Sequence, residues 1–328
     1  MTAQRAFGAD EYLNSSAMVK MAAEFNSLAT GQSQVPKQSV KTRLREQITD
    51  AEVLAYHDLM VDRTGPLFTH FLASVPCILE ELSRVGVAIT RFVRELSKYE
   101  PRTYTFYEVD AFDGSNGRTL AAHAAGSIKT LTSSPNKGNQ PYFDKFADPI
   151  LSCFHAESFM RVTQNCVKQK VGFPEFATGF DFIYETAAFQ FYGKEREEQI
   201  GHVAKLLRPD GLVFFLEKLN HPDMNVYERR EAAKDDLHKS HYFTREEIEW
   251  KRKQMLTQMH DGQVLLEDLV SAIKGHFTHV FLLWNSTNFY ELVASNDASR
   301  IGQFMATIGD PVIPVEFCFE SPVMRRLD

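Results

Sequence analysis

Apolar and polar positions along this chain follow two periods, one typical of strands and one typical of helices. Between about residues 101 and 296, short aromatic and β-branched runs alternate with longer segments of helical spacing. Such alternation predicts a parallel sheet covered by helices on both faces. The predicted strands are Tyr104–Val109, Ser127–Thr132, Ser152–His155, Phe180–Thr186, Leu212–Glu217, Thr278–Trp284 and Phe289–Ala294.

The end of this region carries a hairpin signal. The last two predicted strands are separated only by Asn285-Ser-Thr-Asn288, a loop of hairpin length. The tail beyond Asn296 contains one further apolar run, Val312–Phe319, which the pattern does not assign to an element.

The chain before the sheet has a polar zone and a helical zone. Residues 1–46 are polar, with a predicted helix around Asp10–Leu28 followed by a linker that contains Gly, Pro and Ser. Thr49-Asp-Ala-Glu52 fits a capping box, which predicts a helix start. Apolar residues then recur at i, i+3, i+4 and i+7 from Leu67 to Leu82, so this helix is expected to bury one stripe.

Composition narrows the class of protein. With 328 residues the chain can bury a large core, and its net charge of −7 argues against binding nucleic acid through phosphate contacts. The start of the chain lacks an apolar signal core, and no apolar run approaches the roughly 20 residues that span a bilayer. We therefore expect a soluble, cytoplasmic protein with no membrane partner. The four cysteines are scattered, without a Cys-x-x-Cys pair, and are expected to be buried thiols.

Two segments carry the most specific signals. In the first, the strand Tyr104–Val109 runs into the acidic turn Asp110-Ala-Phe-Asp-Gly114 and then into a helix. In the second, Phe180-Asp-Phe-Ile183 is followed by a helix and by Leu206-Leu-Arg-Pro-Asp-Gly211, which leads into a buried strand. In order and spacing, residues 101–296 resemble the class I S-adenosylmethionine-dependent methyltransferases.

That resemblance implies a fold and an activity. The fold is a Rossmann-like α/β sheet of seven strands with helices on both faces, whose final strand runs antiparallel to the rest. We expect residues 1–100 to be a helical extension or cap, residues 101–296 to be the cofactor-binding domain, and residues 297–328 to be a C-terminal extension. Within the cap, residues 49–97 are expected to cover the cleft, whereas residues 1–46 are expected to be dispensable for folding. The implied cofactor is S-adenosylmethionine.

The first glycine loop departs from the family pattern. In the family, an acidic residue at the end of the first strand is followed by glycines at every second position. Here Glu108 keeps the acid and Gly114 keeps the last glycine, but Asp110 and Phe112 replace the first two. A side chain costs energy where φ must be positive, although Asp tolerates it better than Phe. A register that begins at Asp110 and uses Gly114 and Gly117 is the alternative.

A second departure follows the second strand, where many members of the family carry an acid that binds the ribose. This chain offers Ser134 and Asn136 instead, which would bind the ribose more weakly than a carboxylate. Near the third strand, Ala156 and Glu157 correspond to the adenine contacts, or equally to an ordinary helix N-terminus. The implied cofactor site comprises Glu108, Asp110, Phe112, Asp113, Gly114, Ser134, Asn136, Ala156, Glu157, Glu185 and Thr186.

Methyl transfer needs alignment of the reacting atoms, and a general base only where the acceptor is protonated. Tyr192 follows the fourth strand and His241 lies in the insertion after the fifth, so we expect this pair to act as base or orienter. A structural role is the alternative for each. His238 and His241 lack a third ligand at useful spacing, so we expect no metal. The mixed-sign run from Glu228 to Asp236 is expected to be a solvated helix surface.

The expected substrate is a small molecule with apolar or planar surface. The residues expected to bind it are Phe189, Phe191, His221 and Phe243. Two other classes remain open. One is a protein with this fold that has another activity, or that only binds a ligand or partner. The other is a nicotinamide-dependent oxidoreductase, disfavoured because no Gly-x-Gly-x-x-Gly opens the sheet. A homodimer is also left open.

Overall fold

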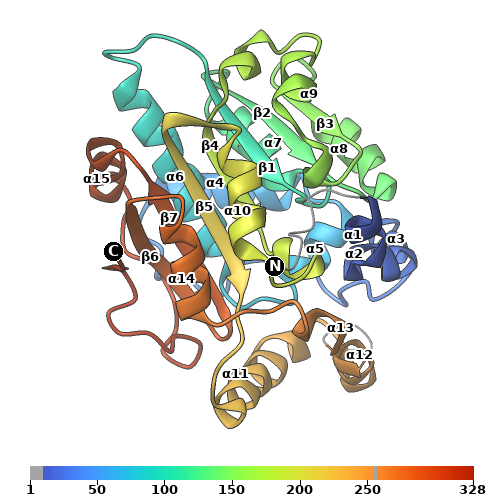
Figure 1. The fold of residues 1–328 in the computed structure, drawn as a ribbon. Helices are drawn as coiled ribbons and strands as arrows, with labels where there is room; N and C mark the ends of the chain where they lie inside the picture. The colour runs from blue at the N-terminus through green and yellow to red at the C-terminus, as the bar shows by residue number, and fades with distance from the viewer. Residues whose placement is uncertain (1–9, 254–256) are drawn as a thin grey trace, which may run out of the picture.

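One sheet organises the molecule. The computed structural model describes residues 10–253 and 257–328, and its eight strands lie in the order β3-β2-β1-β4-β5-β7-β6-β8 (Figure 1). Strands β1 to β5 are parallel to one another, and β7 is antiparallel to both β5 and β6. The strands are β1 Tyr104–Val109, β2 Ile128–Ser133, β3 Ser152–His155, β4 Phe180–Thr186, β5 Leu207–Lys218, β6 His279–Ser286, β7 Phe289–Ser295 and β8 Arg325–Arg326.

Short helices connect and cover these strands. The α-helices are α1 Asp10–Ser15, α2 Ala17–Lys20, α3 Ala22–Ala29, α4 Ala51–Val61, α5 Pro66–Leu72, α6 Ile78–Leu96, α7 Ser115–His123, α8 Gln140–Phe146, α9 Gln164–Lys168, α10 Arg196–Ala204, α11 Met224–Leu237, α12 Arg245–Lys251, α13 Thr257–His260, α14 Leu266–Lys274 and α15 Ala298–Thr307. The 3-10 helices are η1 Lys137–Asn139, η2 Phe159–Arg161, η3 Pro174–Thr178, η4 Phe189–Phe191 and η5 Lys239–His241. None of the helices within the described ranges is long and apolar enough to cross a membrane.

The seven predicted strands are confirmed, and β5 is longer than predicted. It begins at Leu207, because the Pro-Asp-Gly sequence lies inside the strand as an irregularity rather than as a turn before it. The register with β4 pairs Phe180 with Leu207 but Phe182 with Leu212, so extra residues are accommodated on β5. Pro cannot donate to a ladder and is tolerated at such bulges. The two-residue strand β8, which was not predicted, is too short to leave a periodic signal.

Three helix predictions need correction. The N-cap of α4 is Asp50 rather than Thr49, because the Asp50 carboxylate accepts from the backbone N–H of Glu52 at 3.0 Å. The stripe from Leu67 to Leu82 spans two helices, α5 and α6, because the chain turns at Cys77 with φ of +59°. The predicted helix around 10–28 is broken into α1, α2 and α3.

Helices pack on both faces of the sheet. On one face, α6 contributes Phe92, whose ring packs against Phe182 of β4 and Phe304 of α15. On the other face, Ile200 of α10 and Ile273 of α14 join a second buried cluster. The first cluster includes residues from 40 to 96 together with sheet residues. This part of the predicted cap is therefore a layer of the sheet domain.

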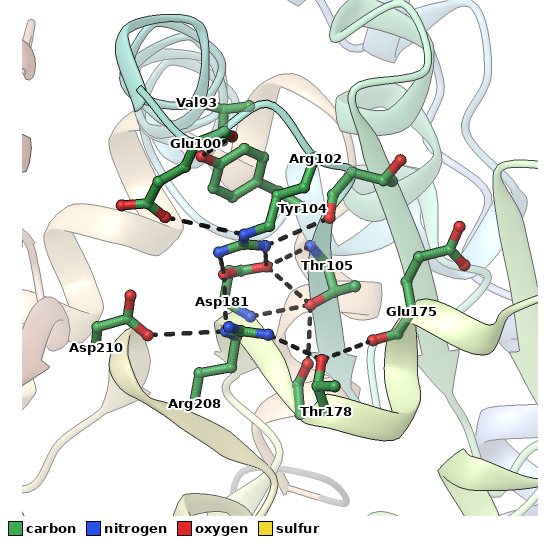
Figure 2. A network of polar contacts seen from close by, with 12 residues as sticks. Val93, Glu100, Arg102, Tyr104, Thr105, Glu175, Thr178, Asp181, Arg208 and Asp210 are labelled. Carbon is green, nitrogen blue, oxygen red and sulfur yellow. Dashed lines mark hydrogen bonds and ion pairs between the residues drawn. The ribbon is translucent and has the colours of Figure 1, made fainter. Parts of the chain in front are cut away.

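The two edges of the sheet are covered differently. At the amino ends of β1 and β4, Asp181 joins a network of polar contacts with Arg102, Thr105 and Arg208 (Figure 2). At the carboxyl ends, α1–α3, α5 and α11–α13 gather around the sheet edge (Figure 1). Because parallel sheets bind ligands at the carboxyl ends of their strands, this second edge is where a site is expected.

Candidate active site

The loop after β1 has an unusual backbone. Asp110, Phe112 and Gly114 have φ of +46°, +54° and +71°, so every second residue after Glu108 is left-handed. These are the three positions at which the family motif has glycine. The loop therefore follows the register that begins at Glu108, since Gly117 of the alternative register lies inside α7. Non-glycine residues rarely adopt this conformation, so other contacts must hold Asp110 and Phe112 there.

The Asp110 side chain supplies such contacts. Its fully buried carboxylate accepts from the Tyr192 hydroxyl at 2.6 Å, the Ser133 hydroxyl at 2.7 Å and the backbone N–H of Phe159 at 2.8 Å. Burial raises the pKa of Asp110 to about 6, although these hydrogen bonds lower it. The carboxylate thus ties the loop to three segments that follow β2, β3 and β4.

Phe112 is held by packing instead. Its ring lies against Phe68 and Phe71 of α5, with centroid distances of 5.8 and 5.1 Å. The loop after β1 is therefore joined to the N-terminal helices at a position where the family motif has no side chain.

Glu108 and Asp113 are buried acids beside this loop. Glu108 accepts from the backbone N–H of Gly117 at 3.1 Å, and burial raises its pKa to about 8. Its other oxygen, Oε1, has no hydrogen-bond partner among the described residues. Asp113 pairs with Arg118 at 2.6 Å and accepts from the backbone N–H of Gly65 at 2.8 Å. Both acids therefore hold the loop from inside the fold.

Two features require glycine at position 114: its positive φ and the close approach of neighbouring side chains. A Cβ added here would lie 2.6 Å from the Thr132 hydroxyl and 3.0 Å from the Phe143 ring. If glycine served only the close approach of the backbone to a cofactor, a side chain at Gly114 would block binding without disturbing the fold. The contacts are instead with β2 and α8, so such a substitution would disturb the fold as well.

A small cavity of about 30 Å³ lies in front of this loop. Five of the residues expected to hold the cofactor line it together: Asp110, Phe112, Ser134, Asn136 and Thr186. The opposite wall comes from the N-terminal helices, with Met18 and Phe25, and from Leu67 of α5. The hydroxyl of Thr186 is buried and has no hydrogen-bond partner among the described residues.

The remaining expected cofactor residues lie outside this cavity. Ala156 is partly buried, and Glu157 is exposed with its carboxylate 3.7 Å from Arg161. Glu185 is fully buried and accepts from the backbone N–H groups of Ala188 and Phe189, while burial raises its pKa well above the usual range. Neither Ala156 nor Glu157 contributes to the lining of the cavity.

The two residues expected to act in catalysis do not share a cavity. Tyr192 is buried and donates to Asp110, and burial raises its pKa well above the usual range. His241 contacts Arg43 and lines a separate cavity of about 720 Å³, formed by the segment around residue 40, the end of α11 and the C-terminal tail. In this arrangement Tyr192 positions Asp110, and His241 faces different surroundings.

The aromatic residues expected to bind substrate also lie in different places. Phe191 lines the small cavity beside the loop, whereas Phe189 is buried against Phe159, with ring centroids 5.2 Å apart. Phe243 packs against His70, and His221 accepts from the backbone N–H of Asp223 at 3.0 Å. Only Phe191 of this group therefore reaches the cleft.

A second cavity, of about 90 Å³, adjoins the small cavity in front of the loop after β1 and shares part of its wall. Four lysines line it: Lys218, Lys234, Lys239 and Lys251. All four are buried, as are Glu231 and Asp235 beside them. The sequence pattern predicted a solvated surface for the helix that carries Lys234, so it missed this cluster. The burial arises from contacts distant in sequence, which no local pattern reports, since Glu231 pairs with Lys218 of β5 and accepts from Asn288, and the Lys234 ammonium group lies over the Phe289 ring.

Comparisons with known proteins add a likeness of fold. No known family and no curated protein matches the chain. The plantazolicin methyltransferase BpumL, solved in complex with SAH, is 9% identical over 85% of this chain and 98% of that chain, with a TM-score of 0.44. The cyclopropane synthase MmaA2 from Mycobacterium tuberculosis is 12% identical over 82% and 75%, with a TM-score of 0.41. A protein from Bordetella parapertussis described as a possible exported protein is 12% identical over 86% and 96%, with a TM-score of 0.43.

The strand order defines the class of fold. The order β3-β2-β1-β4-β5-β7-β6, with β7 alone antiparallel in an otherwise parallel set, is the Rossmann-like arrangement that the resemblance to class I methyltransferases implies. The chain adds β8 at the outer edge, so its sheet has one strand more than expected. The topology agrees with the resemblance, and the ligand and reaction are a separate question.

Proposed function

We propose that this protein is an S-adenosylmethionine-dependent methyltransferase that acts on a small molecule with apolar surface. The observation that carries the proposal is the loop after β1, where a buried acid is followed by left-handed backbone at Asp110, Phe112 and Gly114. This loop lies between β1 and its neighbours β2 and β4, where the strand order reverses. Open α/β sheets bind their ligands at such a switch point.

The backbone of the loop would allow the cofactor to approach closely. The cavity in front of the loop is too small to hold the cofactor unless part of the protein moves. A cavity of about 30 Å³ equals the share of liquid volume of roughly one water molecule. The cofactor is a nucleoside joined to an amino acid, so Met18 and Phe25 would have to leave the cleft. We therefore propose that α1–α3 form a lid over the cofactor site.

The proposed lid rests on an apolar cluster. Met21, Phe25 and Leu28 are almost fully buried, and they pack with Leu67 and Met259. Burial of one such side chain is worth about 1.5–3 kcal/mol, so opening has a substantial cost. A site that is competent in only a fraction of molecules binds more weakly by that fraction. The lid is thus expected to lower the apparent affinity for the cofactor.

When bound, S-adenosylmethionine supplies an electrophilic methyl group on a positively charged sulfur, which keeps the electron pair of the broken C–S bond. The chain supplies position and exclusion of water. Asp110 fixes the loop, and Phe112 and Phe191 form an apolar wall beside it. An acceptor that carries a proton would need a base, and Tyr192 and His241 remain predictions for that role. A methyl acceptor that is already nucleophilic would need none.

A protein that binds the cofactor without methyl transfer is the second candidate. The replaced glycines and the filled cleft favour it, because both restrict the space beside the loop. A nicotinamide-dependent oxidoreductase has no such support from the loop.

Calorimetry on the full-length protein tests these possibilities together. We expect S-adenosylhomocysteine to bind and NAD not to bind. Formation of S-adenosylhomocysteine from S-adenosylmethionine, in the presence of candidate acceptors, then separates the enzyme from the non-catalytic alternative. If S-adenosylhomocysteine fails to bind both the wild type and a Phe25→Ala variant with a weakened lid, the proposal is wrong.

A further inference from the structure

The four lysines of the second cavity come from four different elements. Lys218 ends β5, Lys234 belongs to α11, Lys239 begins η5 and Lys251 ends α12. Their side chains nevertheless line one cavity beside the carboxyl edge of the sheet. Burial of one ammonium group costs several kcal/mol unless it is paired, so burial of four together needs an explanation.

Only part of this positive charge is neutralised within the cluster. Lys218 and Lys234 share Glu231, at 3.0 and 2.6 Å from Nζ to Oε2. Lys239 lies 2.7 Å from Asp235. Two carboxylates thus pair with three of the four lysines, and Arg252 also lies 3.9 Å from Asp235.

Lys251 differs from the other three. Its ammonium group contacts His70 and lies 2.8 Å from the Ser74 hydroxyl, and it forms no ion pair with a carboxylate of the described residues. Burial and the nearby Lys239 and Lys234 lower its pKa well below the usual range. The cavity therefore holds more basic groups than it holds carboxylates to pair with them, and this shortage disfavours the charged form of Lys251 until an anion is present.

Several buried cations elsewhere in the described chain are balanced, with Arg230 as an exception, since its guanidinium group donates to the Tyr290 hydroxyl at 2.7 Å and forms no ion pair with a described carboxylate. Arg196 pairs with Glu217 at 2.7 Å, and Arg118 pairs with Asp113 at 2.6 Å. Each of these guanidinium groups has its own buried carboxylate. The lysine cavity departs from this rule, and it does so beside a cleft rather than deep in the core.

We propose that this cavity binds the anionic group, a carboxylate or a phosphate, of a small-molecule ligand. Lysine ammonium groups act as compact point charges for such anions. A cavity of about 90 Å³ has room for a single group of this kind, since it equals roughly three water molecules in liquid volume. The incoming charge would balance the excess on the lysines.

The rest of the cavity indicates the shape of the ligand. Phe25, Leu67, Phe112 and Phe191 line both this cavity and the small one beside the loop after β1. A ligand whose anionic end meets the lysines would direct its apolar part toward that shared wall. On the proposed function, which this step assumes, such a ligand is the methyl acceptor.

Calorimetry with the full-length protein tests anion binding without any cofactor. Inorganic phosphate and malonate are titrated separately at constant ionic strength, with chloride as the reference anion. We expect at least one of the two to bind, and the preferred one indicates whether the natural group is a phosphate or a carboxylate. If neither binds, the proposal is overturned.

The decisive variant is Lys251→Met, because it removes a positive group without leaving a carboxylate unpaired. We expect affinity for the anion to fall by about tenfold or more, the loss of one charge-assisted hydrogen bond. Lys251→Gln, which keeps a donor for Ser74, serves if the methionine variant does not fold. Lys98→Met is the matched control, because Lys98 is exposed and pairs only with Glu95.

The outcomes separate this inference from the proposed function. Equal anion affinity in the wild type and the Lys251 variants would overturn the inference, because the bound anion would then lie elsewhere. Anion binding that depends on Lys251 supports it even if S-adenosylhomocysteine does not bind. Failure of S-adenosylhomocysteine binding affects only the identity of the ligand as a methyl acceptor.

Discussion

Buried polar groups are paired differently at the two edges of the sheet, which are formed by the amino ends and by the carboxyl ends of the parallel strands. At the amino edge, Asp181 accepts from Arg102 at 2.9 and 2.5 Å and from the backbone N–H of Thr105 at 2.9 Å (Figure 2). Arg208 approaches the same carboxylate at 3.4 Å, so strands β1, β4 and β5 are tied together there. At the carboxyl edge, oxygens of Glu108, Glu185 and Thr186 lack partners among the described residues.

This difference favours a stabilising role for the amino edge and the proposed ligand-binding role for the carboxyl edge. Buried polar groups in native proteins are normally paired, and exceptions call for a reason. At the amino edge the Asp181 carboxylate is paired with protein atoms alone, although Arg208 Nε and Glu175 Oε2 lack hydrogen-bond partners among the described residues. The carboxyl edge leaves one oxygen each of Glu108 and Glu185 without a partner among the described residues and concentrates lysines nearby, which is expected where a ligand completes the contacts.

The largest expected effect lies at the amino edge. Asp181→Ala should lower the free energy of unfolding by about 3–5 kcal/mol, because it leaves Arg102 and the Thr105 N–H without their buried partner. Denaturant unfolding measures this loss, with Asp144→Ala as a control at a site away from the network. A loss below about 1 kcal/mol would contradict the structural role of this edge.

Glu108 at the opposite edge should respond to pH. Its pKa is raised to about 8 in the folded protein, from an ordinary value near 4.5, so the folded state holds a proton that the unfolded state releases. Its contribution to stability is therefore fully present below about pH 4.5 and is lost as the pH rises through about 8. Glu108→Gln mimics the protonated form.

The stability of Glu108→Gln relative to the wild type should therefore rise by about 1 kcal/mol per pH unit across this window. Unfolding curves of both proteins at several pH values measure the difference. A constant difference between about pH 5 and pH 8 would contradict the raised pKa.

Removal of a buried charge from the lysine cavity should have the opposite sign to Asp181→Ala. Lys251→Met is expected to raise the stability of the ligand-free protein by about 1–2 kcal/mol, because an apolar side chain replaces a buried amine whose charged form is disfavoured by burial and by Lys239 and Lys234. Thermal unfolding without anions measures this gain. A loss as large as that of Asp181→Ala would show that the two edges do not differ as described.

The smallest expected effect concerns the lid. Phe25→Ala should raise the affinity for S-adenosylhomocysteine by up to about tenfold, because it removes apolar burial that holds α1–α3 over the cleft. Calorimetry measures the change, and Tyr99→Ala, at an exposed position, is the control. Weaker binding in Phe25→Ala would mean that Phe25 contacts the ligand rather than excluding it.

Sequence patterns were informative where one segment determines its own structure. The strands were predictable because each is a short segment with aromatic or β-branched residues, and some, such as Phe180–Thr186, are buried along their whole length. For the loop after β1 the sequence left two registers open, and the left-handed backbone at Asp110, Phe112 and Gly114 follows the one that begins at Glu108. What a local pattern cannot report is which distant helix will cover a polar face.

The lysine cavity illustrates that limit. Lys234 lies in a helix whose charges of both signs indicate a solvated surface, yet it is buried, with its ammonium group over the Phe289 ring of β7 and paired with Glu231. Residues 1–46 misled for a similar reason. Their composition is polar, but Met21, Phe25 and Leu28 bury together over the cleft, and Val40 and Leu44 join the main core. Removal of the whole segment would therefore cost more stability than its composition suggests.

Phe112 belongs to the walls of both cavities, and this has a thermodynamic consequence. A ligand on either side of its ring changes the packing that the ligand on the other side meets. Any effect of the anion on the affinity for the cofactor must then equal the effect of the cofactor on the affinity for the anion. A single ring would make the two binding events cooperative or antagonistic, and the sign of that coupling would determine which ligand enters first.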